Sequence, residues 1–458
     1  MHFTAPYTLL LLALLCVGCD SFTDVELPNS QLAGGSVFEN ATTANAAMAH
    51  VYASIRDTGL LTGNSSGLSN QLGHYSDELT FYGASSHFSS GFYTNSLAAA
   101  NLNVRSLWNE TYNQIYACNA IIEGVSSAAG IPAQDRDRLT GEALFIRALL
   151  HFYLTGLYGD IPYIKTTDYK SNSTTERMNA GLLYENLLDD LLRAQTLLPE
   201  NYSATGRVIP NRKVANALLA RVYLYNGQWA QAKNSASLLI NDTATYPWED
   251  DLEKIFLKDA GTTLWQLMPA MSGQNTLEAA NFIFMEGPPP LVALRPQLME
   301  AFETGDKRRQ SWTRAVSDGT TTWYHAFKYR ENSITPTSVE YPIIFRLAEQ
   351  YLIRAEASAH MGELEAAAED LNVIRHNAGL ENTTAQTTHD MIEAILAERR
   401  VELFTEHGHR FFDLKRSGHL DQALTPVKPG WNPTDALFPV PQSELLSNPN
   451  LLPQNPGY

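Results

Sequence analysis

The sequence predicts a mostly α-helical protein, a scaffold of tetratricopeptide-like helical hairpins with long loops and minor β structure. Segments 215–240 and 351–375 both have apolar residues at helical spacing on either side of a turn that contains glycine. The stretch ALFIRALLHFYLTGLYGDIP, residues 143–162, has no polar face, which is typical of a helix surrounded by other helices. Together these three segments indicate a frame of packed helices.

Most of the chain before residue 241 shows helical periodicity. Segment 39–57 begins with threonines and then carries apolar residues on one face, and segment 105–126 repeats that spacing. Leucines form an apolar stripe along 182–200, where Pro199 ends the helix. We expect this helix to pair with the helix of 143–162 as a third hairpin.

A charged residue interrupts the apolar stretch 143–162. Arg147 lies inside it, and Gly159 followed by Pro162 predicts a sharp helix end. An unpaired buried charge costs several kcal/mol, so we expect Arg147 to have a carboxylate or carbonyl partner. A structural ion pair is favoured over a contact with a ligand.

Three further segments lack clear helical periodicity. Segment 58–104 is rich in Gly, Ser and Asn with scattered aromatic residues, and we expect an exposed loop there. Segment 241–342 mixes Gly, Pro, Thr and aromatic residues, which indicates irregular or short β structure. After a last helix at 391–408, the proline-rich tail 438–458 must be held by packing.

The N-terminus predicts export. Residues 1–18 contain an apolar run that is too short to cross a bilayer as a helix but suits a secretory signal. Gly18 before Cys19 resembles the lipobox of bacterial lipoproteins, in which the cysteine thiol carries lipid. Cys16 stands where leucine is usual and no Lys or Arg precedes the run, so a signal that is simply cleaved is the alternative.

After the predicted signal, the chain consists of a tether and one large domain. Residues 19–37 are polar with Pro and Gly, as in a tether, and residues 38–458 form the domain. Within it, the hairpin-rich half 38–240 precedes a half with loop insertions, 241–458. No other segment is long and apolar enough to span a membrane.

Composition indicates which partners are excluded and whether disulfides stabilise the fold. The 458 residues include 44% hydrophobic and 18% charged residues, as in a globular protein, and the net charge of −17 argues against a nucleic-acid partner. If Cys16 leaves with the signal and Cys19 carries lipid, Cys118 is left alone and no intramolecular disulfide forms. We expect Cys118 to be a small buried hydrophobic residue.

Seven segments together resemble the SusD/RagB family, outer-membrane nutrient-binding lipoproteins of Bacteroidetes-type bacteria. In chain order they are WNETYNQIYACNAII, ALFIRALLHFYLTGLYGDIP, YENLLDDLLRAQTLLP, ANALLARVYLYNGQWAQA, RLAEQYLIRAEASAHMGELEAAAEDLNVIRHNAGL, AERRVELFTEHGHRFFDLKR and FPVPQSELLSNPNLLPQNPGY. One such segment is a weak signal, but seven in the family order, from about residue 40 to the end, are specific.

The resemblance implies both a fold and a role. It implies that residues 38–458 form a SusD-like helical domain, anchored by lipid at Cys19 to the outer membrane and facing the cell exterior. It also implies a partner, a SusC-like TonB-dependent transporter over which the lipoprotein closes as a lid. The family binds glycans or, in some members, peptides, without catalysis and without a cofactor.

Sugar binding needs flat aromatic faces with polar groups at their edges. Two loop-like regions supply both. The candidate ligand-binding residues are Tyr75, Asp77, Phe81, Tyr82, Phe88, Phe92, Tyr93 and Asn95 in the first region, and Trp312, Trp323, Tyr324 and Arg330 in the second. For each aromatic residue the alternative is packing of the loop onto the body, and Trp108 and Trp229 are expected in the core.

The sequence lacks the common enzyme and metal signatures. The sequence has no HExxH, GxSxG, GxxxxGK[ST] or paired CxxC motif. His407 and His409 are more typical of hydrogen-bonded turn residues than of a metal site. Carboxylate pairs for glycoside hydrolysis remain open, because their separation in space is unknown from sequence.

Acidic and basic residues alternate near the last helix. We expect an ion-pair network that fastens it, formed by Glu398, Arg399, Arg400, Glu402, Arg410 and Asp413. The rival to nutrient capture is an exported helical-repeat scaffold that binds another protein and no small ligand.

Overall fold

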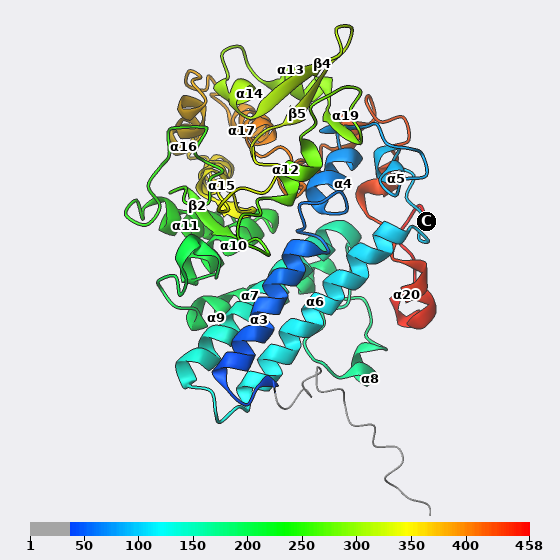
Figure 1. The fold of residues 1–458 in the computed structure, drawn as a ribbon, viewed down its shortest axis with the longest axis vertical. Coiled ribbons are helices and arrows are strands. Elements are labelled where there is room, and N and C mark those ends of the chain that lie inside the picture. The colour runs from blue at the N-terminus through cyan, green and yellow to red at the C-terminus, as the bar shows by residue number, and fades with distance from the viewer. Residues whose placement is uncertain (1–36) are drawn as a thin grey trace, which may run out of the picture.

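The computed structural model describes residues 37–458, and its frame is an array of helices that pack in chain order (Figure 1). The frame helices are α3 (Ala41–Asp57), α6 (Leu102–Ser126), α7 (Ala133–Tyr158), α9 (Ala180–Leu197), α10 (Arg212–Tyr225), α11 (Trp229–Ile240), α15 (Leu347–His360), α16 (Leu364–Asn377) and α17 (Thr388–Glu402). Each packs on its neighbour, and α11 packs directly on α15 although a long segment separates them in sequence. The predicted mostly helical hairpin scaffold is confirmed.

Shorter elements connect and cover this frame. The helices are α4 (Leu68–Tyr75), α5 (Ser90–Tyr93), α8 (Tyr169–Asn172), α12 (Leu277–Phe282), α13 (Pro296–Ala301), α14 (Lys307–Ser311), α18 (His409–Arg416), α19 (Leu420–Leu424), α20 (Gln442–Ser447) and the 3-10 turns η3 (Thr205–Arg207), η4 (Pro433–Ala436) and η5 (Pro449–Leu451). The strands are β1 (Leu79–Phe81), β2 (Thr263–Gln266), β3 (Val292–Leu294), β4 (Thr313–Ser317), β5 (Thr322–Ala326) and β6 (Ile343–Arg346).

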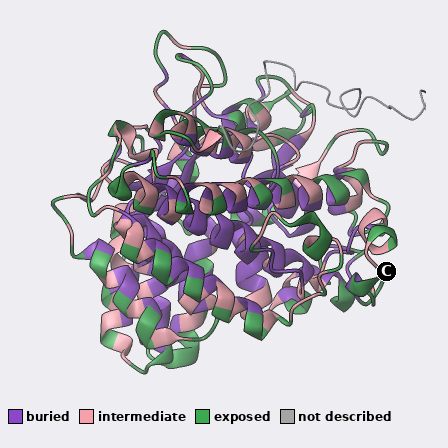
Figure 2. Ribbon diagram, turned by 90° about the horizontal axis from the view of Figure 1, so that it is seen from below, coloured by how far each residue is buried: buried purple, intermediate pink, exposed green. Residues whose placement is uncertain are grey.

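The strands pair as three small antiparallel sheets within the described residues. They are β1 with β3, β2 with β6, and the hairpin β4 with β5. Five of the six strands lie in or at the edge of the segment between α11 and α15, where short β structure is expected, and β1 precedes α6. Figure 2 shows buried residues concentrated where the frame helices meet one another, with exposed residues on their outer faces.

Helix α7 explains how the frame holds a charge in its interior. The Arg147 guanidinium donates to Asp190 of α9 at 2.8 and 2.6 Å and to the Asn119 side chain of α6 at 2.7 Å. Gly159 ends α7 at φ +74°, a conformation that favours glycine. The predicted ion pair and helix end are confirmed.

The hairpin turns also match the sequence pattern. Gly227 and Gly362 have φ of +68° and +78° between the paired helices. Buried alanines on the facing helices, such as Ala232 and Ala367, let the backbones approach closely. The hairpin pair α7 and α9 packs in the same way, which confirms the predicted third hairpin.

Ion pairs fasten α17 as predicted. Arg399 donates to Asp413 of α18 at 2.7 Å, and Arg308 bridges Glu398 and Glu402 at 2.6 and 2.8 Å. His407 is a buried turn residue whose ring nitrogen meets the carbonyl oxygen of Ile343 at 2.9 Å. These contacts are structural.

The proline-rich tail is held by the frame. The backbone N–H of Phe438 donates to the carbonyl of Leu157 at 2.8 Å, and the Asn455 amide donates to the carbonyl of Tyr158 at 2.9 Å. Phe438 is fully buried, as is Cys118 on α6. Packing therefore orders the tail, and Cys118 is the small buried residue expected.

Two expectations are wrong. Segment 58–104 is not an exposed loop throughout, because all eight residues of α4 are buried beneath the aromatic residues that follow. Trp229 is half-buried instead of being in the core, and its ring stacks on His360 with centroids 3.9 Å apart.

The predicted signal, the lipidation at Cys19 and most of the tether lie outside the described residues. Among residues 37–458, no helix combines the length and the apolar character that crossing a membrane requires.

Candidate functional site

Strand pairing brings the two predicted aromatic regions together. β1 pairs with β3 so that Phe81 faces Val292, and the N–H of Tyr82 extends the ladder to the carbonyl of Leu291 at 2.8 Å. β3 in turn packs against β5, which carries Trp323. Residues from segment 79–93 therefore share one surface with the β4–β5 hairpin, which lies near the top of Figure 1.

Tyr82 and Trp323 both lie on this surface, Tyr82 at the end of the β1–β3 ladder and Trp323 on β5. Tyr82 is 40% exposed and Trp323 is half-buried. Partial burial raises the pKa of Tyr82, and hydrogen bonding by Trp323 opposes that effect. A Cβ added to Gly287 would lie 2.1 Å from the Trp323 ring, so the ring rests directly on the backbone of that glycine.

More aromatic rings extend the surface from Tyr82. Phe81 lies 6.2 Å from Tyr93 and 5.7 Å from His87, measured between ring centroids. His87 stacks on Phe88 at 4.2 Å. We call this set the aromatic surface; its members are Phe81, Tyr82, His87, Phe88, Tyr93 and Trp323.

Five of the predicted ligand-binding residues are buried and do not reach this surface. Tyr75 donates to the carbonyl of Asp435 at 3.0 Å, and the Trp312 indole donates to the carbonyl of Leu252 at 3.0 Å. Phe92 is fully buried. Expecting ligand contacts from these three was wrong, because the core covers both faces of each ring.

Asp77 and Asn95 also have structural partners. Asp77 accepts hydrogen bonds from Arg400 at 2.9 Å and from Arg410 at 2.8 and 2.9 Å. Asn95 donates to the carbonyl of Tyr75 at 3.0 Å. Both side chains fasten the base of the loops, and their polar atoms are not presented to a ligand.

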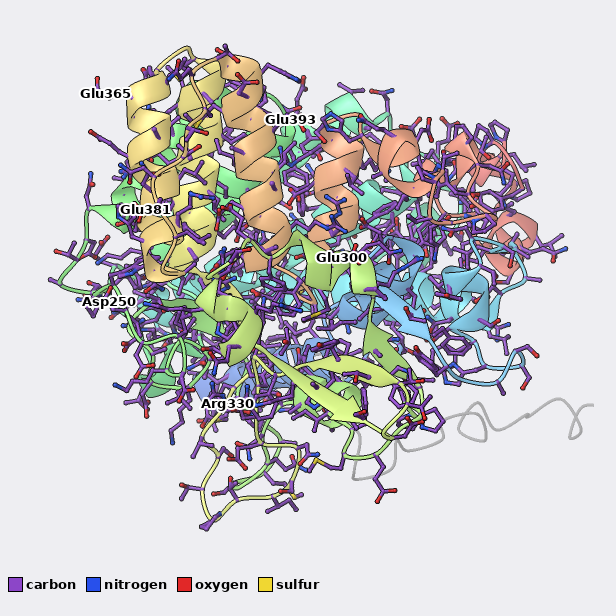
Figure 3. The ribbon with its side chains drawn as sticks, turned by 90° about the horizontal axis from the view of Figure 1, so that it is seen from above. Asp250, Glu300, Arg330, Glu365, Glu381 and Glu393 are labelled. Atoms are coloured by element: carbon purple, nitrogen blue, oxygen red, sulfur yellow. The ribbon has the colours of Figure 1, made fainter. Side chains whose placement is uncertain are left out.

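Of the remaining two predicted residues, Tyr324 lies within the hairpin and Arg330 follows it. Tyr324 packs against the core cluster below β5, on the opposite side of the strand from Trp323. Arg330, labelled in Figure 3, follows β5. It pairs with Glu253 at 3.3 Å. Its guanidinium carbon also lies 5.4 Å from the centroid of the Phe327 ring. Both residues border the aromatic surface without forming it.

Two polar groups buried beneath the aromatic surface, His74 and Glu78, are held in their neutral forms. Burial lowers the pKa of His74 to about 3, and His74 meets the edges of Phe81 and Tyr93 at 5.5 and 6.1 Å. Burial, with a smaller contribution from Asp77, raises the pKa of Glu78 to about 8. These two groups therefore add little charge beneath the rings at neutral pH, and the charges of Asp77, Arg400 and Arg410 nearby are paired with one another.

A separate cavity lies at the loop that follows the hairpin. Its volume is about 310 Å³, and it is bounded by the C-terminal end of α3, by residues 269–280 and by residues 331–334. Polar and aliphatic side chains line it, including Asp57, Gln274 and Ile334. We call it the loop pocket. Ligand pockets of roughly 300–1,000 Å³ are usual in proteins.

Sequence reasoning missed His87 and Gly287. His87 contributes an aromatic face, although histidine gave no sugar-binding signal in a loop otherwise rich in Phe and Tyr. Gly287 precedes three prolines, and by itself this GPPP run indicates only irregular structure. Its role under Trp323 depends on a contact that sequence does not reveal.

Across residues 37–458, no three His, Cys, Asp or Glu side chains come together in a way that could hold a metal ion. The arrangement offers partly exposed aromatic rings and a cavity lined by polar and aliphatic side chains. Such a surface can hold a ligand noncovalently by stacking and hydrogen bonding.

Comparison with protein families identifies two matching models. A model described as the SusD family matches residues 297–458, and a model described as "Starch-binding associating with outer membrane" matches residues 38–224. The two matches cover the N-terminal frame helices and the C-terminal part from α13 onward.

Two relatives from Formosa agariphila are similar to this chain over most of its length. The chain is 26% identical to "SusD-like protein P2" over 426 residues, which cover 78% of this chain and 81% of the relative. It is 23% identical to "SusD-like protein P38" over 416 residues, which cover 77% and 79% of the two chains.

Solved structures share the fold. A SusD superfamily protein from Bacteroides vulgatus superimposes with a TM-score of 0.80 at 21% identity, covering 92% of this chain and all of that one. A structure titled "Laminarin binding SusD-like protein" gives a TM-score of 0.77 at 24% identity, with the same coverage of both chains.

Proposed function

The chain belongs to the SusD family, and on this premise we propose that it is a nutrient-binding protein that captures glycans on its aromatic surface. The observation that carries the proposal is that β3 joins β1 and β5, which places Tyr82 and Trp323, from segments far apart in sequence, on one surface with further partly exposed rings. Similarity to a laminarin-binding protein and to a starch-binding family description supports the choice of glycans.

Capture requires stacking and hydrogen bonding, and no covalent step. The C–H faces of a pyranose ring stack on the Trp323 indole, which Gly287 supports from below. The Tyr82 hydroxyl and ring-edge polar groups bond to sugar hydroxyls. Because these rings are held by β1, β3 and β5, little ordering is needed on binding.

We further propose a place for this capture at the cell surface. Lipid on Cys19 anchors the protein to the outer membrane with its body outside the cell, and a SusC-like TonB-dependent transporter receives the glycan while this protein closes over it as a lid. Ligand favours closure through contacts that it makes in the closed state. Cys19→Ala should release the protein from membranes; retention of the variant in the membrane fraction would contradict the anchor.

The second candidate is an exported scaffold that binds a protein through its helical hairpins and takes no small ligand. The stacked hairpins α10–α11 and α15–α16 favour it, because such arrays present extended surfaces to partners. This candidate predicts that glycans and peptides do not bind.

A calorimetric panel of neutral glycans, including laminarin and soluble starch, separates the two candidates. We expect at least one glycan to bind, and Trp323→Ala or Tyr82→Ala to weaken that binding about tenfold or more. Tyr116→Ala is the matched control, since Tyr116 is 51% exposed on α6 away from the aromatic surface. No binding to the panel by the wild-type chain would favour the scaffold.

A further inference from the structure

The loop pocket has a wall that the fold holds in place. The Asn275 side-chain amide donates to the carbonyl of Ser333 at 3.1 Å and to the Thr335 hydroxyl at 2.9 Å. Its carbonyl oxygen accepts from the backbone N–H groups of Val339 and Glu340 at 2.9 and 3.2 Å. One side chain thus uses all its main hydrogen-bonding groups to fix the loop that bounds the pocket.

Backbone contacts tighten the same wall. The N–H of Thr335 donates to the carbonyl of Gly273 at 2.9 Å, and the N–H of Gly273 donates to the Ser338 hydroxyl at 3.0 Å. Gly273 has φ +87°, and a Cβ there would lie 2.4 Å from the Thr335 carbonyl oxygen. The two loops are therefore joined before any ligand arrives.

The pocket offers hydrogen-bonding groups that the rest of the described chain does not use. The side chains of Glu331, Asn332 and Ser333 line it, and none bonds to another residue within 37–458. Aliphatic walls come from Leu277 and Ile334, both of which are exposed. A carboxylate, an amide and a hydroxyl opposite aliphatic surface match a polyhydroxylated ligand with apolar C–H faces.

Charge limits which ligand fits. Arg56 is the basic side chain among the described pocket residues, and its guanidinium is engaged by Asp57 at 2.6 Å and by the carbonyl of Met268 at 2.8 Å. Glu331 and Asp57 leave the lining acidic. The net charge of the chain is −17, and Figure 3 labels acidic side chains that are exposed over the upper face: Asp250, Glu300, Glu365, Glu381 and Glu393. Sulfated or carboxylated sugars would meet repulsion here.

The pocket is within reach of the aromatic surface. Glu331 follows Trp323 by eight residues, so the two are at most about 28 Å apart even if the chain were extended. α12, whose N-terminal residues line the pocket, packs against β5. In Figure 3, Arg330 marks the part of the chain that connects the hairpin to the pocket wall.

We propose that the loop pocket is a second saccharide subsite, which receives the part of a neutral glycan chain that extends beyond the aromatic surface. This inference rests on the proposed function. The aromatic surface stacks one portion of the chain, and Glu331, Asn332 and Ser333 bond to hydroxyls of another portion. Short oligosaccharides reach one site, while longer ones reach both.

The test is calorimetry of the mature chain with two neutral series, laminaribiose to laminarihexaose and maltose to maltohexaose. Asn332→Ala with Ser333→Ala should weaken binding of the hexasaccharide about fivefold and leave the disaccharide unchanged. Asn241→Ala, an exposed asparagine that follows α11, is the matched control. Both pocket positions are at the surface, so folding should be unaffected.

The predicted repulsion of charged sugars by the pocket is tested by comparing laminarin with its sulfated derivative. We expect the sulfated form to bind more weakly than laminarin, and Glu331→Gln to reduce the difference. If the pocket variants leave hexasaccharide affinity unchanged while Trp323→Ala removes it, the subsite is overturned and the proposed function stands. If neither series binds to the wild-type chain, the proposed function fails, and the subsite with it.

Discussion

Helix α7 and the β4–β5 hairpin both carry aromatic residues, and they place them in opposite environments. In α7, Phe145, Phe152 and Tyr153 are buried among the neighbouring helices. In the hairpin, Trp323 and Tyr324 point to opposite sides of one strand, so that one ring packs on the core and the other reaches the surface. The same residue types therefore stabilise the frame in one region and form a candidate ligand surface in the other.

The difference arises from how many neighbouring elements pack against each region. A helix in the middle of an array has neighbours on every side, whereas a two-stranded hairpin has one face that nothing in the chain must cover. The frame can supply rigidity while the hairpin and the adjoining loops vary. Changes in the frame should therefore alter stability, and changes at the aromatic surface should alter affinity.

The largest expected effect is in the frame, at Arg221. Its guanidinium donates to Glu349 at 2.6 Å through two nitrogens and to the Tyr153 hydroxyl at 2.9 Å, joining α10, α15 and α7. Arg221→Ala leaves Glu349 buried without its partner, which should lower the free energy of unfolding by about 3–5 kcal/mol. Urea denaturation followed by circular dichroism measures this change.

The control is an exposed ion pair, Lys254 with Asp251 at 3.1 Å. Lys254→Ala should change the free energy of unfolding by less than about 1 kcal/mol, because solvent screens the pair. Equal effects of the two alanine variants would contradict the view that buried pairs join the frame.

A smaller effect is expected from Glu278, where the loop segment meets the body. Burial is the main cause that raises the pKa of this carboxyl from 4.5 to about 7. Between these values the folded chain binds the proton and the unfolded chain releases it, so stability falls as pH rises through this window. The contribution of the shift is roughly 3 kcal/mol across the window.

Glu278→Gln removes that contribution. Relative to the variant, the wild-type chain should lose stability between pH 4.5 and about 7 and change little more above it. Thermal unfolding at a series of pH values tests this. A constant difference between the two chains would show that the carboxyl does not titrate in the folded state as described.

The smallest effect on stability and the clearest effect on affinity are expected at Gly287. A Cβ there would collide with the Trp323 ring, so Gly287→Ala should displace the indole and weaken glycan binding about tenfold, with little loss of stability. Gly91→Ala is the matched control, since its Cβ would meet nothing closer than 3.5 Å. If the Gly287 variant binds glycan with unchanged affinity, the Trp323 indole does not contact the ligand.

Sequence predicted the frame well because helical periodicity is local. The segment 39–57 became α3, and the polar interruption at Arg147 correctly indicated an ion pair. Each of these inferences depends on residues that lie within a few turns of one another. The exception is Asp190, the ion-pair partner of Arg147. Its identity could not be read from the pattern.

The candidate site was predicted only in part because its geometry is not local. Phe92 and Tyr93 are neighbours with the same kind of side chain, yet one is in the core and the other belongs to the aromatic surface. Which of them faces outward depends on the loop's packing over α4 and on β3, far along the chain. Sequence could name the region and could not choose between its rings.

The most direct test is a crystal structure of the mature chain with the glycan of the panel that binds most tightly. The account predicts a sugar ring stacked on Trp323 beside Tyr82, with the frame helices unchanged. A glycan seated among the helical hairpins, with Trp323 and Tyr82 free of contacts, would contradict it.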